Sequence, residues 1–486
     1  MTHRKGSRTL LVGFVLSLFF AFSPTVAVGP ARLVKDVNTT LSKASGSFPG
    51  RFVELGGVTL FRAYSPDTGV ELWRTDGTEA GTALVKDINP GTASSADFFT
   101  LPSPSEPLAV VDGILFFVAN DGTHGFELWK SDGTEAGTVL VKDITPGPAG
   151  TPLLEFVGLN GILLFEAITA DHGDALWRSD GTAAGTLFLK DITPDPVNVD
   201  PKSLVELGGT LFLPATDGIH GIELWKTDGT AAGTVLVKDI NSPAGSYPSG
   251  LTDVDGVLFF TAEGDSATGR ELWKSDGTAA GTVLVKDILP GPGGSDPREL
   301  TDVDGTLYLV ANDYVHRDQV WKSDGTAAGT VLVKEVVPDF NTIGGPDAVV
   351  GFNGVLFFVA DDGIRGLELW RTDGTDAGTL VVKDIQPGWI QAVYPPLAAT
   401  AGGLYFGADD GIHGVELWKS DGTGAGTVLV KDINPRVRTN DSINRFAVEA
   451  GGRLFFSAND GPHGIELWRT DGTEEGTALV IKKFAR

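Results

Sequence analysis

The sequence of 486 residues contains no cysteine and only one methionine, Met1. The absence of cysteine excludes disulfides, thiolate metal ligands and a cysteine nucleophile, so the folded chain must be stable through its core alone. Basic residues are also scarce, because 37 Lys and Arg stand against 63 Asp and Glu and give a net charge of −26. Nucleic acid and anionic membrane surfaces are therefore poor partners for this protein.

Long apolar runs are absent beyond the first 27 residues, so no later segment approaches the roughly 20 residues that a membrane helix needs. The first 27 residues combine Arg4, Lys5 and Arg8 with an apolar stretch over 10–22 and small residues ending at Ala27. This pattern predicts a signal peptide over 1–27, followed by a short linker over 28–32. An uncleaved anchor is the alternative. We expect a secreted, extracellular or cell-envelope protein with no membrane insertion after cleavage.

Glycine and aromatic residues are abundant, with 65 Gly, 27 Phe and 10 Trp. Nine of the ten tryptophans recur at intervals of 48 to 56 residues, which indicates a tandem array over 33–486. These repeat tryptophans are Trp73, Trp129, Trp177, Trp225, Trp273, Trp321, Trp370, Trp418 and Trp468.

Each repeat tryptophan begins the string W-x-x-D-G-T-x-x-G-T. The aspartate of such a string can accept backbone N–H bonds across a turn, and the glycine after it can adopt a positive φ. We therefore interpret the string as a structural turn, with the tryptophan filling the space between sheets. Its aspartates are Asp76, Asp132, Asp180, Asp228, Asp276, Asp324, Asp373, Asp421 and Asp471.

Each repeat divides into four strand-like pieces, which in the fifth copy cover 251–254, 257–262, 271–276 and 282–288. We name them strands A, B, C and D. In all nine copies the A–B link is a Gly-Gly, Asp-Gly or Asn-Gly dipeptide, which favours a two-residue hairpin. The prediction is an all-β, single β-propeller of nine four-stranded blades, with a β-solenoid as the alternative. "LVKDV" over 33–37 repeats strand D and is predicted to lie near the last blade.

The string "ELWKSDGTEAGT" and its other copies resemble the bacterial ELWxxDGT repeat family. The resemblance covers about nine tenths of the chain. It implies an exported protein of propeller-like architecture, and it implies no established reaction.

The candidate binding residues lie outside the structural string. Six of the seven histidines fall five residues before a repeat tryptophan, in the B–C turn that shares a face with the variable D–A loops. Trp389 and Tyr394 lie in one of those loops and could contact a sugar or a protein partner. The predicted binding residues are Trp389, Tyr394, His124, His220, His413 and His463.

No GxSxG, HExxH or phosphate-binding loop is present, so the sequence predicts no enzyme. The first functional hypothesis is a non-enzymatic exported protein that binds protein or carbohydrate through the loop-bearing face. A polysaccharide hydrolase or lyase, with acids and arginines at the channel mouth, and a Ca²⁺-stabilised cell-surface structural protein are the alternatives. No cofactor is expected, with Ca²⁺ as the alternative, and the oligomeric state stays open.

Overall fold

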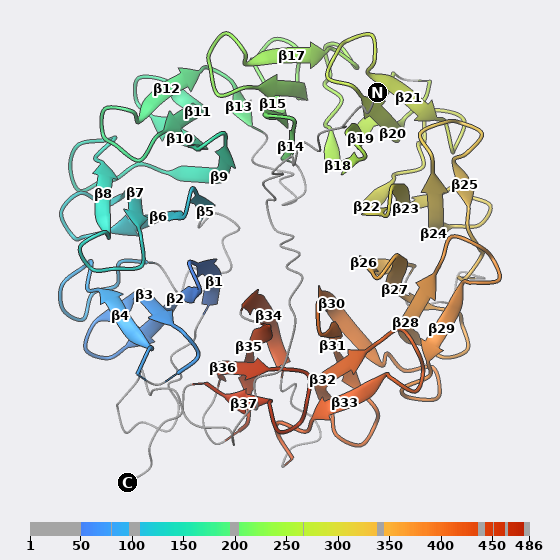
Figure 1. Ribbon diagram of the computed structural model, residues 1–486. Coiled ribbons are helices and arrows are strands. Elements are labelled where there is room, and N and C mark those ends of the chain that lie inside the picture. The colour runs from blue at the N-terminus through green and yellow to red at the C-terminus, as the bar shows by residue number, and fades with distance from the viewer. Residues whose placement is uncertain are drawn as a thin grey trace, which may run out of the picture.

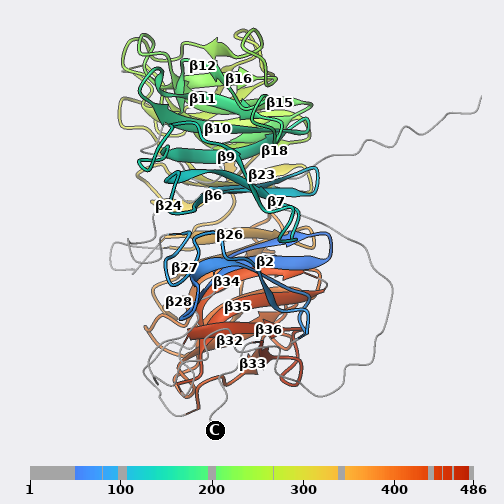
Figure 2. The same cartoon turned by 90° about the vertical axis from the view of Figure 1, so that its left-hand side faces the viewer.

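The structure, a computed structural model, describes residues 50–480 except 79, 97–106, 195–203, 266, 338–344, 436–442, 451 and 462–464. The predicted signal peptide and linker, the strand-like segment 33–37 and His463 lie outside the described residues. Figure 1 shows the described strands as separate sheets arranged around one axis, and Figure 2 shows the same ring from its side. The described residues form nine antiparallel blades of a β-propeller, as predicted, and the β-solenoid alternative is wrong.

Strands A and B form the inner half of each blade. The A strands are β1 (Gly50–Leu55), β5 (Leu108–Val111), β9 (Leu153–Leu159), β14 (Val205–Leu207), β18 (Ser249–Val254), β22 (Arg298–Val303), β26 (Asp347–Phe352), β30 (Val393–Thr400) and β34 (Ile443–Ala450). The B strands are β2 (Val58–Ser65), β6 (Ile114–Asn120), β10 (Ile162–Thr169), β15 (Thr210–Thr216), β19 (Val257–Glu263), β23 (Thr306–Asn312), β27 (Val355–Asp361), β31 (Gly403–Asp409) and β35 (Arg453–Asn459).

Strands C and D form the outer half. The C strands are β3 (Gly69–Thr75), β7 (Phe126–Ser131), β11 (Gly173–Ser179), β16 (Glu223–Thr227), β20 (Arg270–Ser275), β24 (Asp318–Ser323), β28 (Leu367–Thr372), β32 (Val415–Ser420) and β36 (Ile465–Thr470). The D strands are β4 (Ala83–Lys86), β8 (Val139–Lys142), β12 (Leu187–Lys190), β17 (Val235–Lys238), β21 (Val283–Lys286), β25 (Val331–Leu332), β29 (Leu380–Lys383), β33 (Val428–Lys431) and β37 (Ala478–Leu479). Blade 4 carries one further strand, β13 (Thr193–Pro194), which pairs with β15.

The A–B hairpins follow the turn type that the dipeptides predict. Asp112 and Gly113 have φ values of 49° and 75°, and six other dipeptides likewise have positive φ at both residues. Two positive φ values define the type I′ turn that fits the twist of a hairpin. Among the described dipeptides, Gly402-Gly403 differs because only Gly403 has a positive φ.

Strand D is shorter than the sequence predicts. The backbone amides just after it donate to the carboxylate of a buried glutamate on strand C and not to the backbone of strand C. In blade 5, β21 ends at Lys286, and the amide of Ile288 donates to Glu271 Oε2 at 3.0 Å. Leu289 donates to the other oxygen of Glu271 at 3.2 Å. The glutamate therefore ends the ladder and fixes the start of the D–A loop.

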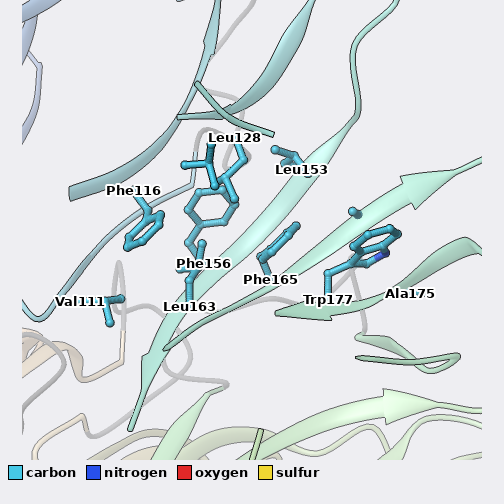
Figure 3. Close-up of a cluster of buried hydrophobic side chains, with 11 residues drawn as sticks. Val111, Phe116, Leu128, Leu153, Phe156, Leu163, Phe165, Ala175 and Trp177 are labelled. Carbon is cyan, nitrogen blue, oxygen red and sulfur yellow. The ribbon is translucent and has the colours of Figure 1, made fainter. Parts of the chain in front are cut away.

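Strand B packs on both of its faces, as its apolar sequence predicts. In β6, Leu115 and Phe117 contact blade 1, whereas Phe116 contacts blade 3. Figure 3 shows this second cluster, in which Phe116 of blade 2 lies beside Phe156 and Leu163 of blade 3. Each repeat thus shares its core with two neighbours.

Two rings of cation-to-carbonyl hydrogen bonds join successive blades. The Lys or Arg after the repeat tryptophan reaches the motif glycine of the next blade, as when Lys130 Nζ donates to Gly181 O at 2.8 Å. The lysine at the end of strand D reaches the next blade as well, as when Lys238 Nζ donates to Thr282 O at 2.7 Å. Lys238 also lies 5.9 Å from the centre of the Trp273 ring. These basic residues therefore hold neighbouring blades together.

The ring closes between blade 9 and blade 1. Arg469 Nη1 donates to Gly77 O at 2.9 Å, and Phe61 and Trp73 share a core with Phe455. Strand β37 completes blade 9 from its own repeat.

Arg469→Met is expected to lower the free energy of unfolding by about 1.5–3 kcal/mol, because a charged hydrogen bond at the closure is lost. Arg74→Met is the matched control, since Arg74 donates the equivalent bond to Gly133 O at 3.3 Å between two blades already joined by the chain. Urea denaturation should show the larger loss for Arg469→Met. Equal losses would contradict a special role for this bond in closing the ring.

Candidate functional site

The B–C turns and the D–A loops lie on one face, which we call the loop-bearing face. Thr151, at the end of a D–A loop, donates its amide to Phe126 O of the B–C hairpin at 2.8 Å. Ser95 and Val70 make the equivalent contact in the first blade at 3.1 Å. The W-x-x-D-G-T turns lie on the opposite face together with the A–B turns, because Leu55 and Leu60 lie beside Gly133.

The repeated string forms a closed network of short hydrogen bonds within its turn. Asp132 Oδ1 accepts from the amide and the hydroxyl of Thr134 at 2.9 and 2.6 Å. The hydroxyl bond from Thr134 is the largest of the effects that lower the pKa of Asp132. Ser131 and Thr138 bridge the base of the turn at 2.7 Å. The string uses its polar atoms within the turn, as a structural element does.

Three of the predicted histidines each form an acid–imidazole pair within their own blade. His124, His220 and His413 place Nδ1 2.7, 2.9 and 2.8 Å from an aspartate three residues earlier. His316 makes the same pair with Asp313 at 2.7 Å. The pairs belong to different blades and do not converge, and the described residues hold no group of three potential metal ligands.

Trp389 and Tyr394 lie in different structural elements. Trp389 is 72% exposed in the loop between β29 and β30. Tyr394 is instead a ladder residue of the inner strand β30, where it pairs with Gly407 and is partly buried. The prediction that both residues share one loop is wrong, because β30 begins at Val393.

The loop that carries Trp389 is seated between the B–C turns of blades 7 and 8. Ala392 donates to Leu367 O at 3.0 Å, and Asp409 donates to Ala392 O at 2.9 Å. A Cβ on Gly366 would collide with the backbone of Ile390, so the loop and the turn are in direct contact. Trp389 therefore lies beside the turns of two blades.

Exposed apolar side chains that were not among the predicted binding residues also lie on this same face. Ile219, Val315, Ile364 and Ile412 occupy one equivalent position, six residues before the repeat tryptophan, and are 60–76% exposed. The equivalent residues of blades 1–3 are Asp67, Thr123 and Asp171. With their exposed neighbours they form what we call the apolar arc: Ile219, Tyr314, Val315, Ile364, Trp389, Ile390 and Ile412.

The turns below the arc share one conformation. In blade 4, Asp217 Oδ1 accepts the amides of Ile219 and His220 at 2.9 and 3.1 Å. Blades 6, 7 and 8 repeat this pattern. Because the same turn recurs around one axis, the tips stand at the same level of the face.

Acidic side chains gather on the opposite face near the axis. Burial raises the pKa of Asp302, and the charges of Asp255, Asp253 and Asp304 raise it further. The amide of Gly305 donates to Asp302 Oδ1 at 3.0 Å and lowers the pKa of Asp302 in part. Among the described residues, no helix is long and apolar enough to cross a membrane.

By its fold, the chain is a nine-bladed β-propeller. No protein-family model matches its sequence, and no curated protein matches it. Its resemblance to the ELWxxDGT family stays a prediction from the residues.

Solved structures that match the chain include puromycin hydrolases and peptidases. A puromycin hydrolase is 15% identical with a TM-score of 0.39, and the match covers 89% of this chain and 61% of that one. A puromycin-hydrolyzing peptidase of Mycobacterium tuberculosis is 12% identical with a TM-score of 0.39, covering 90% and 61%. Prolyl oligopeptidase B of Galerina marginata is 11% identical with a TM-score of 0.39, covering 76% and 54%. The chain thus spans about three fifths of the peptidases it matches.

These matches require a correction to the functional hypothesis. The sequence predicts a non-enzymatic protein that binds protein or carbohydrate, with a polysaccharide-acting enzyme or a Ca²⁺-stabilised structural protein as alternatives. The structures named above are a puromycin hydrolase and two peptidases, so the hypothesis and its alternatives are wrong as stated. At this identity and TM-score, no activity is transferred to the chain.

Proposed function

We propose that the protein attaches to the surface of a lipid bilayer through the apolar arc. One observation carries the proposal: every large apolar side chain that is more than half exposed in the described residues belongs to this arc. Scattered exposed apolar residues are normal on a protein surface, whereas a set gathered on one face, here from blades 4, 6, 7 and 8, indicates an interaction surface.

The shape of the arc favours a bilayer as the occupant. Its side chains stand on separate turn tips at one level and do not converge into a pocket, so they suit a flat and deformable apolar layer. Tryptophan and tyrosine, here Trp389 and Tyr314, are the side chains enriched at membrane interfaces. Attachment at the interface requires no spanning segment.

The charges of the chain select the kind of lipid. A net charge of −26 opposes binding to anionic lipid, so a zwitterionic surface is the expected partner. Of the four aspartates at the foot of the arc, Asp362 has an arginine partner, Arg365. Each tip that enters the interface stabilises the bound state by about 1 kcal/mol, which predicts reversible attachment.

Sedimentation with phosphatidylcholine vesicles tests this function. The variant Ile364→Ser/Trp389→Ser/Ile390→Ser is expected to bind at least tenfold more weakly than the wild type, because about 3 kcal/mol of apolar burial is lost. The matched control is Val139→Ser/Leu187→Ser/Val428→Ser, which removes partly exposed side chains from the outer D strands. It should bind as the wild type does.

Two outcomes would overturn the proposal. The first is a wild-type protein that stays in the supernatant at every lipid concentration. The second is a dimer in analytical ultracentrifugation that the triple arc variant abolishes, since the arc would then be an interface between two copies of the chain.

A further inference from the structure

The turns that support the apolar arc also contain carboxylate–imidazole pairs, whose net charge changes when the imidazole takes up a proton. We call these pairs the switch. We propose that attachment to a neutral lipid surface strengthens when the histidines of blades 4, 6 and 8 take up a proton. This inference rests on the lipid attachment proposed above and concerns the regulation of that same site.

The switch consists of one carboxylate–imidazole pair at the foot of each tip. His220, His316 and His413 each follow directly after an exposed tip residue, which is Ile219, Val315 or Ile412. Their Nδ1 atoms lie 2.7–2.9 Å from the Oδ2 atoms of Asp217, Asp313 and Asp410, and the imidazoles are about one-third exposed.

The aspartate of each pair stays ionised over the relevant pH range. In blade 8, the amides of Ile412 and His413 donate to Asp410 Oδ1 at 2.9 and 3.0 Å. These bonds and the histidine lower the pKa of Asp410, against the effect of burial, which is the largest single contribution and raises it. The net charge of the pair therefore depends on whether the imidazole carries a proton, and histidine is the side chain type whose charge changes within the physiological pH range.

Blade 7 has a permanently charged residue at the position of the switch histidines. Arg365 stands where the other blades have histidine, and its guanidinium contacts Asp362 Oδ2. Because arginine keeps its charge at every physiological pH, the pair of Arg365 and Asp362 below Ile364 has no net charge over that whole range. Arginine is thus compatible with this turn and with an exposed aliphatic tip.

Other charges face the same position from the end of strand D. Arg365 Nε lies 3.9 Å from Asp384 Oδ2. In blade 6, the bond to Asp313 is the largest effect that raises the pKa of His316, and the charge of Glu335 adds to it. Asp239 and Asp432 are the equivalent residues of blades 4 and 8. In blade 2, where the same pair occurs away from the arc, the bond to Asp121 is the largest effect that raises the pKa of His124, and the charge of Glu127 on strand C adds to it.

Strand C carries Glu223, Gln319 and Glu416 at the position of Glu127 in blades 4, 6 and 8. Arg317 directly follows His316 on its turn. Carboxylates thus predominate around the three switch histidines. Protonation of these histidines changes the charge of their pairs from −3 to zero.

An ionised group that enters the lipid interface must give up hydration. When the histidines are neutral, the negative charges of Asp217, Asp313 and Asp410 have no cationic partner within their pairs. These charges lie directly below the tips and oppose insertion. When the histidines are protonated, each of these aspartates has a cationic partner, as Asp362 has in blade 7. Affinity for phosphatidylcholine vesicles is expected to be about tenfold higher at pH 5.5 than at pH 8.

The variant His220→Arg/His316→Arg/His413→Arg places the blade 7 residue in all three switch positions. It is expected to bind vesicles at pH 8 as tightly as the wild type does at pH 5.5, with no dependence on pH between them. His124→Arg is the matched control: it changes an identical pair with Asp121, 2.7 Å apart, in a blade whose tip is Thr123. The control should keep the wild-type pH dependence.

The possible results separate the switch from the attachment itself. Wild-type binding that is equal at pH 5.5 and 8, and is lost in the triple serine arc variant, would overturn the switch and leave lipid attachment standing. A triple arginine variant with wild-type pH dependence would also overturn it. Absence of vesicle binding at every pH would refute both proposals. Circular dichroism at both pH values verifies that each variant is folded.

Discussion

Replacement of Trp418 by alanine is expected to lower the free energy of unfolding by about 3–5 kcal/mol. Trp418 is 6% exposed and fills the space between blades 7 and 8, against Phe357 and Phe406. Lys383 of blade 7 lies over its ring, 5.4 Å from the centre. Alanine would leave a cavity at the interface of two blades and remove a cation–π contact.

Trp389 provides the matched control within the same chain. It is 72% exposed, so Trp389→Ala should change the free energy of unfolding by no more than about 0.5 kcal/mol. Urea denaturation followed by circular dichroism measures both variants. A loss below about 1 kcal/mol for Trp418→Ala would show that the repeat tryptophans do not determine the stability of the ring.

The fold could be predicted because its causes are local and recur in every copy. The dipeptide Asp112-Gly113 favours a type I′ hairpin between two apolar runs, and the sequence shows nine Gly-Gly, Asp-Gly or Asn-Gly dipeptides at this position. The end of strand D could not be predicted in the same way. It depends on Glu271, which is distant in sequence and receives the amide of Ile288 only after the sheet has formed.

The candidate site was predicted less well, for a related reason. The histidines stand out in the sequence because they recur, and the structure shows that this recurrence belongs to the turn. Ile364 and Ile412 look like ordinary core residues in a sequence, and their exposure follows only from their place on a turn tip. The available signal was the change along the repeats at that one position, from Asp67 in the first blade to Ile364 in the seventh.

The bonds made by the basic residues after the repeat tryptophans are a further feature that the sequence does not reveal. Lys130 and Arg178 look interchangeable in the sequence, and both donate to the motif glycine of the next blade. Their bonds could not be foreseen from one repeat, since the acceptor lies about 50 residues further along the chain. Interactions between repeats are therefore the part of this fold that the period alone does not define.

The buried glutamates of strand C make the stability of the ring depend on pH. Glu368 is fully buried, and burial raises its pKa to about 8, with the charge of Asp384 adding to the effect. Its Oε1 accepts the amides of Ile385 and Gln386 at 3.0 and 3.3 Å, whereas its buried Oε2 has no hydrogen-bond partner. Burial also raises the pKa of Glu71, to about 7.

The sign of the effect follows from the raised pKa. The folded chain holds the proton of Glu368 up to about pH 8, whereas the unfolded chain loses it near the ordinary value of 4.5. The stability that this carboxyl contributes is therefore complete below about pH 4.5 and is lost as the pH rises toward 8. Glu368 alone should lower the free energy of unfolding by about 3 kcal/mol between pH 5 and 8.

Blade 6 shows that a neutral amide suits the same position. Gln319 replaces the glutamate there: Oε1 accepts the amide of Val336 at 2.9 Å, and Nε2 donates to the carbonyl oxygens of His316 and Val337 at 2.6 and 2.9 Å. Gln319 thus satisfies its backbone neighbours without a charge. A glutamine in blade 7 can make the same bonds and has no proton to lose.

Glu368→Gln is therefore expected to raise the free energy of unfolding at pH 8 by about 3 kcal/mol and to leave it nearly unchanged at pH 5. The reverse substitution, Gln319→Glu, is the matched control and should destabilise blade 6 increasingly as the pH rises. Urea denaturation of both variants and the wild type at pH 5, 6.5 and 8 measures these differences. A Glu368→Gln variant that is less stable than the wild type at pH 8 would show that the ionised carboxylate, through its two backbone amides, is the form that the fold requires.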